Sequence, residues 1–245
     1  MELTLSLTFL VAFISSILSG IAGVGGGFIM APYWLLIGMT PAQGATNGSF
    51  MALGMSASSL VAFRGTEHFP RNKKLTAVLV AITVITSTAG ALILPHIEVG
   101  SFKVILAAVT IISLPLLFIN KKKIHYHRRH QIIGLMFLTL LLLAGSIIFS
   151  SAFSILIAIV LSTLLNLTVL QSTALRRLIG LVQVSILFGV LALQGNFIWT
   201  HALVAISGGA LGSYIGTRIA IKKGEKFAKY ALAVGALISA VALLF

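Results

Sequence analysis

Two short stretches near the start of the chain carry residue types that can recognise a small anion. Residues 20–28 read GIAGVGGGF, and the run Gly25, Gly26 and Gly27 breaks an α-helix unless its neighbours compensate, because each glycine costs about 1 kcal/mol relative to alanine. A helix broken inside a membrane leaves N–H groups without partners, and the start of the next helix attracts negative charge. The stretch predicts either an anion-binding broken helix or close helix packing through small residues.

The second stretch, residues 40–49, begins with a helix-start signal, a threonine before a proline, and then offers several polar side chains within two turns. A similar stretch at 171–177 adds two adjacent arginines. Polar side chains at membrane depth usually face the interior of the helix bundle and often mark a pathway. The candidate solute-binding residues are Gly25, Gly26, Gly27, Gln43, Thr46, Asn47, Ser49, Gln171, Thr173 and Arg177.

Some of these residues also have a purely structural interpretation. A single serine or threonine is explained equally by a hydrogen bond to the backbone of its own helix. Arg176 and Arg177 are explained as anchors at the cytoplasmic face, and in that interpretation one of the two can still have a functional role. Gln43 and Gln171 occur in corresponding stretches of the two halves of the chain, and this correspondence favours a functional role for both.

The elements that position these residues must be membrane helices. The chain has 245 residues, of which 58% are hydrophobic and 9% charged, and its mean hydropathy is +1.11. An ordinary soluble domain carries about 25% charged residues, so a water-soluble globule is excluded. The segments lack the alternation of barrel strands. We expect an all-α polytopic membrane protein with some broken or re-entrant segments, from apolar segments at 3–19, 21–38, 42–63, 75–95, 102–119, 131–149, 152–170, 173–193, 200–220 and 229–245, each near the length of about 20 residues that crosses a bilayer.

The distribution of charge predicts the orientation in the membrane. The chain has 17 basic and 4 acidic residues, a formal net charge of +13. If all ten segments cross, every basic residue except Lys103 falls on one face, which indicates a cytoplasmic face rather than a nucleic-acid partner. We expect a multi-pass protein of the plasma (inner) membrane, with loops 64–74, 121–130 and 221–229 cytoplasmic and both termini outside.

A weak internal repeat divides the chain into two halves. Each half contains five segments, an odd number, so the second half is inverted relative to the first, as in many secondary transporters. We expect a first membrane repeat at 1–120, a basic cytoplasmic linker at 121–130 and a second, inverted repeat at 131–245. Residues 41–46 (PAQGAT) resemble 169–174 (VLQSTA), residues 63–66 (FRGT) resemble 193–196 (LQGN), and residues 88–92 (TAGAL) resemble 207–211 (SGGAL).

The first-half motifs resemble those of a known family. The residues that carry the resemblance are 23–28 (GVGGGF), Pro32, Pro41, Ala42, Ala45, Thr46, Arg64 and Gly65. This pattern is similar to the sulfite exporter TauE/SafE family, and the likeness covers essentially the whole chain, including its size and basic central loop. It implies a multi-pass permease for sulfur-containing or other small organic anions, with Arg177 where the family often has a basic residue. Where the family usually repeats its glycine-rich motif, this chain has Ser146, Ser150, Ser151, Ala152 and Ser154.

These observations predict a transporter of a small anion such as sulfite, a sulfonate or another organic acid. Export by alternating access at the repeat interface fits best, because a monovalent anion leaving a negative-inside cell gains about 2.3 kcal/mol per 100 mV and needs no coupling residue. An anion channel on the same scaffold is the alternative, and a membrane-embedded enzyme ranks last. With no cysteine and no HExxH-type motif, we expect no catalytic residues, cofactor or bound metal. The expected partners are the anionic solute and the lipid bilayer, and the oligomeric state stays open.

Overall fold

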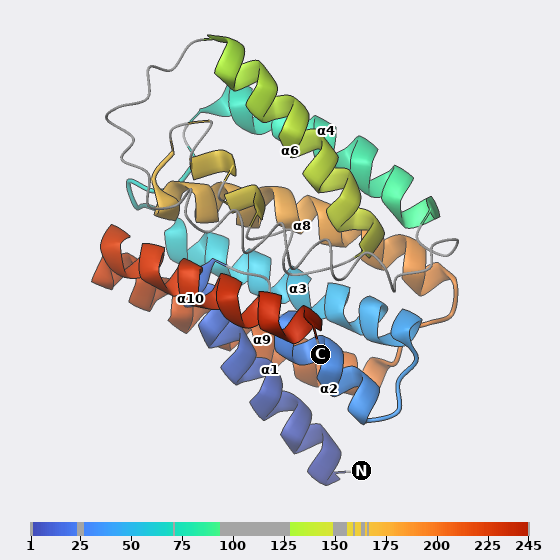
Figure 1. Cartoon of the computed structure of the whole chain (residues 1–245). Helices are drawn as coiled ribbons and strands as arrows, with labels where there is room; N and C mark the ends of the chain where they lie inside the picture. Colours follow the sequence, from blue (N-terminus) through green and yellow to red (C-terminus); the bar gives the residue numbers. More distant parts are fainter. Residues whose placement is uncertain are drawn as a thin grey trace.

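The computed structural model describes residues 2–23, 27–70, 72–93, 128–148, 156–158, 160–162, 165 and 167–244 (Figure 1). Every regular element in this part of the chain is helical, which confirms the predicted all-α class. Residues 156–158 and 160–162 are also helical, whereas the expected segment 102–119 lies outside the described residues. The helices are α1 (Glu2–Ala22), α2 (Gly27–Leu36), α3 (Pro41–Phe63), α4 (Lys73–Ile93), α6 (Arg128–Ile148), α8 (Val169–Leu193), α9 (Trp199–Lys223) and α10 (Glu225–Leu244).

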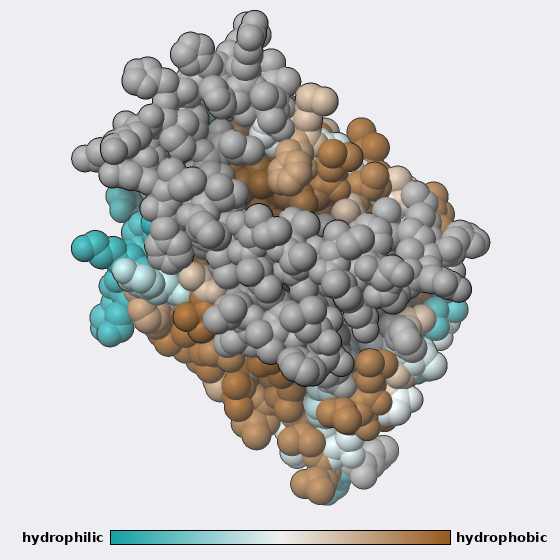
Figure 2. Space-filling model, in the orientation of Figure 1, coloured by the Kyte–Doolittle hydropathy of each residue, from teal (hydrophilic) through white to brown (hydrophobic). Residues whose placement is uncertain are grey.

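The surface of the bundle matches a bilayer. Among the described residues, α1, α4, α8 and α9 are long and apolar enough to cross a membrane. In Figure 2 most of the coloured surface is apolar, and most of the hydrophilic surface gathers at the left of the view, with a smaller group at the right edge. Exposed apolar surface of this extent marks contact with a membrane or with another protein. Exposed large apolar side chains include Leu3, Ile85, Leu140, Leu193 and Tyr230.

Helices α3 and α8 begin and end in the same way. The Thr40 hydroxyl accepts the N–H of Gln43, and the Gln43 side chain accepts the N–H of Thr40. Thr168 and Gln171 make the same reciprocal pair at the start of α8. Such capping boxes satisfy N–H groups that a helix start leaves without partners. Both helices are followed by a turn whose glycine has a positive φ, Gly65 at 80° and Gly195 at 78°.

These two helices lie side by side and run in opposite directions at the centre of the bundle (Figure 1). The end of α3 meets the start of α8, because Phe63 packs in one buried cluster with Val169 and Leu170. The same cluster contains Ala22, the last residue of α1, and Ala228 near the start of α10. We call this end of the molecule the basic end, because the described loop and terminal residues there include Arg64, Lys73, Lys74, Lys222, Lys223, Lys226 and Lys229.

The remaining helices exchange partners between the two halves of the chain. Helix α4 packs against α6 and α8, whereas α9 packs against α1 and α3. The contacts correspond in detail. Ser87, the fifteenth residue of α4, lies 3.4 Å from Ser146, the nineteenth of α6, measured between hydroxyl oxygens. Ser213, the fifteenth residue of α9, packs its backbone against Gly20, the nineteenth of α1.

The predicted segment 21–38 is split between two helices. Its first residues finish α1 at Ala22, and its remainder forms α2, which begins at Gly27 and has 10 residues. Ten residues span about 15 Å, half the thickness of the hydrocarbon core. The Tyr33 hydroxyl lies 2.6 Å from the Thr8 hydroxyl and donates to the Thr4 carbonyl at 3.2 Å, so α2 folds back along the beginning of α1.

Glycines let α9 approach α1 backbone to backbone. Gly208, Gly212 and Gly216 recur every fourth residue on one face of α9 and lie against carbonyl oxygens of α1. A Cβ on Gly216 would overlap the Ile17 carbonyl oxygen, so a side chain there would force the helices apart. This is the small-residue packing that membrane helices use in place of a hydrophobic driving force.

We therefore expect Gly216→Ala to destabilise the protein, because the added methyl group must separate two backbones. The expected loss is about 1–3 kcal/mol, typical of overpacking. The matched control is Gly189→Ala in α8, where a Cβ would meet nothing within 4 Å. Thermal unfolding of detergent-purified variants measures both, and equal melting temperatures would contradict the packing described for α1 and α9.

Candidate functional site

Helix α8 carries a buried arginine to the end of α1. Arg177 is 6% exposed, and its Nη2 donates to the Ser19 carbonyl at 2.8 Å and to the Ser19 hydroxyl at 2.9 Å. Ser19 lies in the last turn of α1, where carbonyls lack partners within the helix and the helix dipole favours a cation. Arg177 lies about 12 Å along α8 from its start, and its guanidinium group is enclosed by the helices near the end of α1. Its burial argues against the anchoring role that the sequence left open.

Its neighbour Arg176 also turns into the bundle. Its Nη1 occupies the space beside Gly180 where a side chain would otherwise lie, on the side of α8 that faces Ser56 of α3. Two adjacent guanidinium groups therefore extend along α8 towards different helices. The chain as a whole has only 4 acidic residues, so carboxylates are scarce partners for this positive charge.

Thr173 lies one helical turn before Arg177 and faces Gly23, the residue directly after α1. Gly23, directly after α1, has a φ of 70°, and the Thr173 side chain fills the space where a Cβ of Gly23 would lie. Thr173 is 4% exposed. Residues four apart share one face of a helix, so a hydroxyl and a guanidinium group are presented together beside the end of α1. Gly25 and Gly26 lie outside the described residues, and Gly27 is the first residue of α2.

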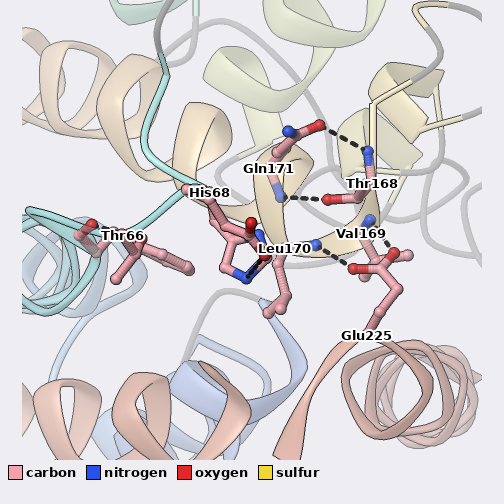
Figure 3. A network of polar contacts seen from close by, with 9 residues as sticks. Thr66, His68, Thr168, Val169, Leu170, Gln171 and Glu225 are labelled. Atoms are coloured by element: carbon pink, nitrogen blue, oxygen red, sulfur yellow. Dashed lines mark hydrogen bonds and ion pairs between the residues drawn. The ribbon is translucent and has the colours of Figure 1, made fainter. Parts of the chain in front are cut away.

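The start of α8 already binds a carboxylate of its own chain (Figure 3). Glu225, the first residue of α10, accepts the N–H of Val169 through Oε1 and that of Leu170 through Oε2, the latter at 3.2 Å. The next N–H, that of Gln171, goes to the Thr168 hydroxyl at 3.1 Å. This arrangement shows that the helix start favours negative charge. Sequence reasoning placed Glu225 at a loop without a role, although a carboxylate in so acid-poor a chain was a usable signal.

The other predicted residues are held by protein partners. Gln43 and Gln171 use their side-chain oxygens in the two capping boxes. Thr46 and Ser49 donate to carbonyls one turn back in α3, at 2.7 and 2.8 Å. The Asn47 side-chain oxygen accepts the N–H of Ile198, the residue before α9, at 3.2 Å. The structure thus places Thr173 and Arg177 close together. The predicted residues of α3 lie towards the opposite end of the bundle, where they cap or stabilise α3 or, in the case of Asn47, join it to α9.

Sequence reasoning missed a second polar contact of α8. Gln183 is 3% exposed, and its Nε2 donates to the Ser146 hydroxyl at 2.9 Å. Ser146 lies in the last turn of α6 and donates to the Leu142 carbonyl at 2.8 Å. Gln183 stands in an otherwise apolar segment, and that isolation was the available signal. Helix α8 therefore touches the last turns of both α1 and α6, through residues about 9 Å apart along its axis.

We expect Glu225→Ala to destabilise the protein by about 1–3 kcal/mol, because it leaves two buried N–H groups at the start of α8 without an acceptor. Glu67→Ala is the control, since the Glu67 side chain is 83% exposed. Thermal unfolding of the purified variants provides the measurement. A Glu225 variant that melts with the wild type would mean that the carboxylate contributes nothing to the start of α8.

Comparison with known proteins places the whole chain among membrane transporters. It is 27% identical to a probable membrane transporter protein, YfcA, of Escherichia coli (strain K12), over 99% of this chain and 90% of that protein. It is 28% identical to the probable membrane transporter protein ORF9 of Sinorhizobium sp., over 98% and 92%. A probable membrane transporter protein of Haemophilus influenzae is 24% identical over 90% and 87%. No solved structure matches the chain.

The comparison with protein families covers nearly the whole chain. The model of the family described as Sulfite exporter TauE/SafE matches residues 8–243, which include all of the helices that surround the interruption after α1. The match agrees with the resemblance seen in the glycine-rich and proline-containing motifs of the first half. The protein is thus a multi-pass membrane transporter, and it belongs to the sulfite exporter TauE/SafE family.

Proposed function

We propose that the protein exports a small anion, such as sulfite, a sulfonate or another organic acid, by alternating access between two inverted repeats. The observation that carries the proposal is Arg177, a guanidinium group buried among the helices beside the end of α1. A buried charge is costly in a bilayer and is usually retained for function. The family description supports a sulfur oxyanion as the solute.

The charges of the site support an anion. Arg177 and Thr173 offer a guanidinium group and a hydroxyl on one face of α8, and both are donors that suit oxygens of sulfite, sulfonates and carboxylates. We place the solute contacts on these two side chains and on the glycine run 25–27. Gln43 and Gln171 then act by fixing the starts of α3 and α8, and the remaining α3 residues act by positioning that helix.

The internal correspondences of the fold support an inverted repeat of 1–120 and 131–245, joined by 121–130. Helices α3 and α8 share their capping boxes and their terminal glycine turns, yet they run in opposite directions. The exchange of α4 and α9 between the halves is the pattern expected when a two-fold axis lies in the membrane plane. Such a pair of halves can rock around a site between them, which is the basis of alternating access.

The placement of acidic residues favours export without a coupled ion. In the described part of the chain, Glu2 and Glu225 begin helices and Glu67 lies in the loop after α3. None of these three occupies the middle of a spanning helix, where proton-coupled carriers commonly hold a carboxylate. The membrane potential alone, worth about 2.3 kcal/mol per 100 mV for a monovalent anion, then drives the solute outward.

We further propose that the basic end faces the cytoplasm of the inner membrane. The chain has no cysteine, so single-cysteine variants report one position each. Glu67→Cys, in the basic-end loop, is expected to react with a membrane-impermeant thiol reagent only in everted vesicles. Gln194→Cys, exposed at the other end of α8, is expected to react only in intact cells. The opposite labelling pattern would reverse the orientation.

Transport itself is tested in proteoliposomes with an imposed potential. We expect sulfite flux that rises with a potential negative on the side the solute leaves. Arg177→Gln should lower that flux about ten- to a hundredfold, the loss typical of a charged hydrogen bond, and Arg177→Lys should lower it less. The control is Arg218→Gln, an exposed arginine whose recorded hydrogen bonds go to Tyr214.

The alternatives give different results in the same assay. A flux that does not depend on the potential would refute the uniport mechanism. If Arg177→Gln transports sulfite as fast as the wild type, the buried guanidinium group does not contact the solute. Saturable counterflow is expected for a carrier, whereas single-channel currents would favour an anion channel.

A further inference from the structure

The side-chain oxygen of Gln183 is buried without a hydrogen-bond partner. Gln183 is 3% exposed, and within the described part of the chain its Oε1 has no donor within hydrogen-bond distance. A buried acceptor left unsatisfied costs about 1–3 kcal/mol. Native structures keep few such atoms, and each needs a reason.

The Gln183 amide turns its nitrogen towards Ser146. The Ser146 hydroxyl donates to the Leu142 carbonyl at 2.8 Å or to the Ser87 hydroxyl at 3.4 Å. In this arrangement Ser146 accepts from Gln183, whose Nε2 lies 2.9 Å away. The unpartnered atom is consequently the oxygen, which accepts a hydrogen bond and cannot donate one.

Gln183 lies on the helix that also carries Arg177. Their contacts are the last turns of α6 and α1, two helices that correspond in the proposed repeat. The two residues are about 9 Å apart along α8, which runs away from the basic end, and they face different sides of that helix.

We propose that Gln183 is a specificity-determining residue, whose Oε1 accepts a hydrogen bond from a donor group of the transported anion. This inference rests on the proposed transport function and narrows its substrate class. A carbonyl-type oxygen repels the oxygens of a fully deprotonated anion but pairs with a hydroxyl, an amine or a protonated oxygen. The preferred solute is then a singly charged anion that also carries such a donor, for example a hydroxysulfonate or a hydrogen oxyanion.

The test uses two probes that differ in one hydroxyl group, 2-hydroxyethanesulfonate and ethanesulfonate. Their fluxes are measured with the full-length protein in proteoliposomes, for the wild type, Gln183→Met and Ser185→Ala. Methionine keeps the length of glutamine without its carbonyl oxygen. Ser185 is exposed on the same helix, so its variant controls for general effects on α8. Thermal unfolding checks that the variants fold, and Gln183→Leu serves as a second apolar variant if Gln183→Met does not.

The wild type and Ser185→Ala are expected to transport the hydroxyl-bearing probe about fivefold or more faster, the value of one hydrogen bond to a buried acceptor. Gln183→Met should lose this preference, so that the ratio of its two fluxes approaches one. Equal wild-type fluxes, or a preference unchanged in the folded Gln183 variants, would overturn the inference and leave the transport function standing.

Two further outcomes separate the remaining explanations. Absence of any wild-type anion flux, sulfite included, would overturn the proposed function and the inference with it. Replacing Na⁺ by K⁺ in the medium should change nothing. A flux that requires Na⁺ in the wild type and not in Gln183→Met would assign the oxygen to a cation and overturn the inference.

Discussion

The structure depends on one constraint, the need of every backbone polar group inside a bilayer to find a partner within the protein. A helix can stop at membrane depth only where other groups receive its end. In this structure the Arg177 guanidinium group donates to the Ser19 carbonyl in the last turn of α1, and the Gln183 amide donates to the Ser146 hydroxyl in the last turn of α6. Both Arg177 and Gln183 come from α8, so this single helix contacts the last turns of two others.

The first N–H groups of α8 also have partners within the protein. They go to Glu225 and to Thr168, whereas α3 begins with Pro41, which has no N–H to satisfy at that position. The two central helices therefore solve the same problem with different residues. The start of α8 uses a carboxylate of α10, far along the chain, whereas the start of α3 uses Pro41 and the capping box of Thr40 and Gln43. The two helices therefore share a capping box but differ in the groups that complete their starts.

Much of this architecture could be predicted from the sequence, because hydropathy and glycine act locally. Seven of the ten apolar segments begin and end within four residues of an observed helix, whereas 102–119 and part of 152–170 lie outside the described residues. Segment 21–38 is divided, because α1 ends at Ala22 and α2 begins at Gly27. The roles of Gln43 and Gln171 were harder to predict, since a glutamine three residues after a threonine is both a capping residue and a polar group in a membrane. Gln183 and Glu225 escaped prediction because their partners, Ser146 and Val169, lie on other helices, and a pattern within one segment carries no information about such contacts.

The glycine ridge of α9 also has a mechanical consequence. Gly208, Gly212 and Gly216 rest on the backbone of α1, so a shift of one helix along the other must carry backbone past backbone. The corresponding seam between α4 and α6 is lined by side chains such as Ser87 and Ser146, which can re-form their contacts at a shifted register. A displacement between α1 and α9 would have to separate two backbones, whereas a displacement between α4 and α6 would have to break the contact between Ser87 and Ser146.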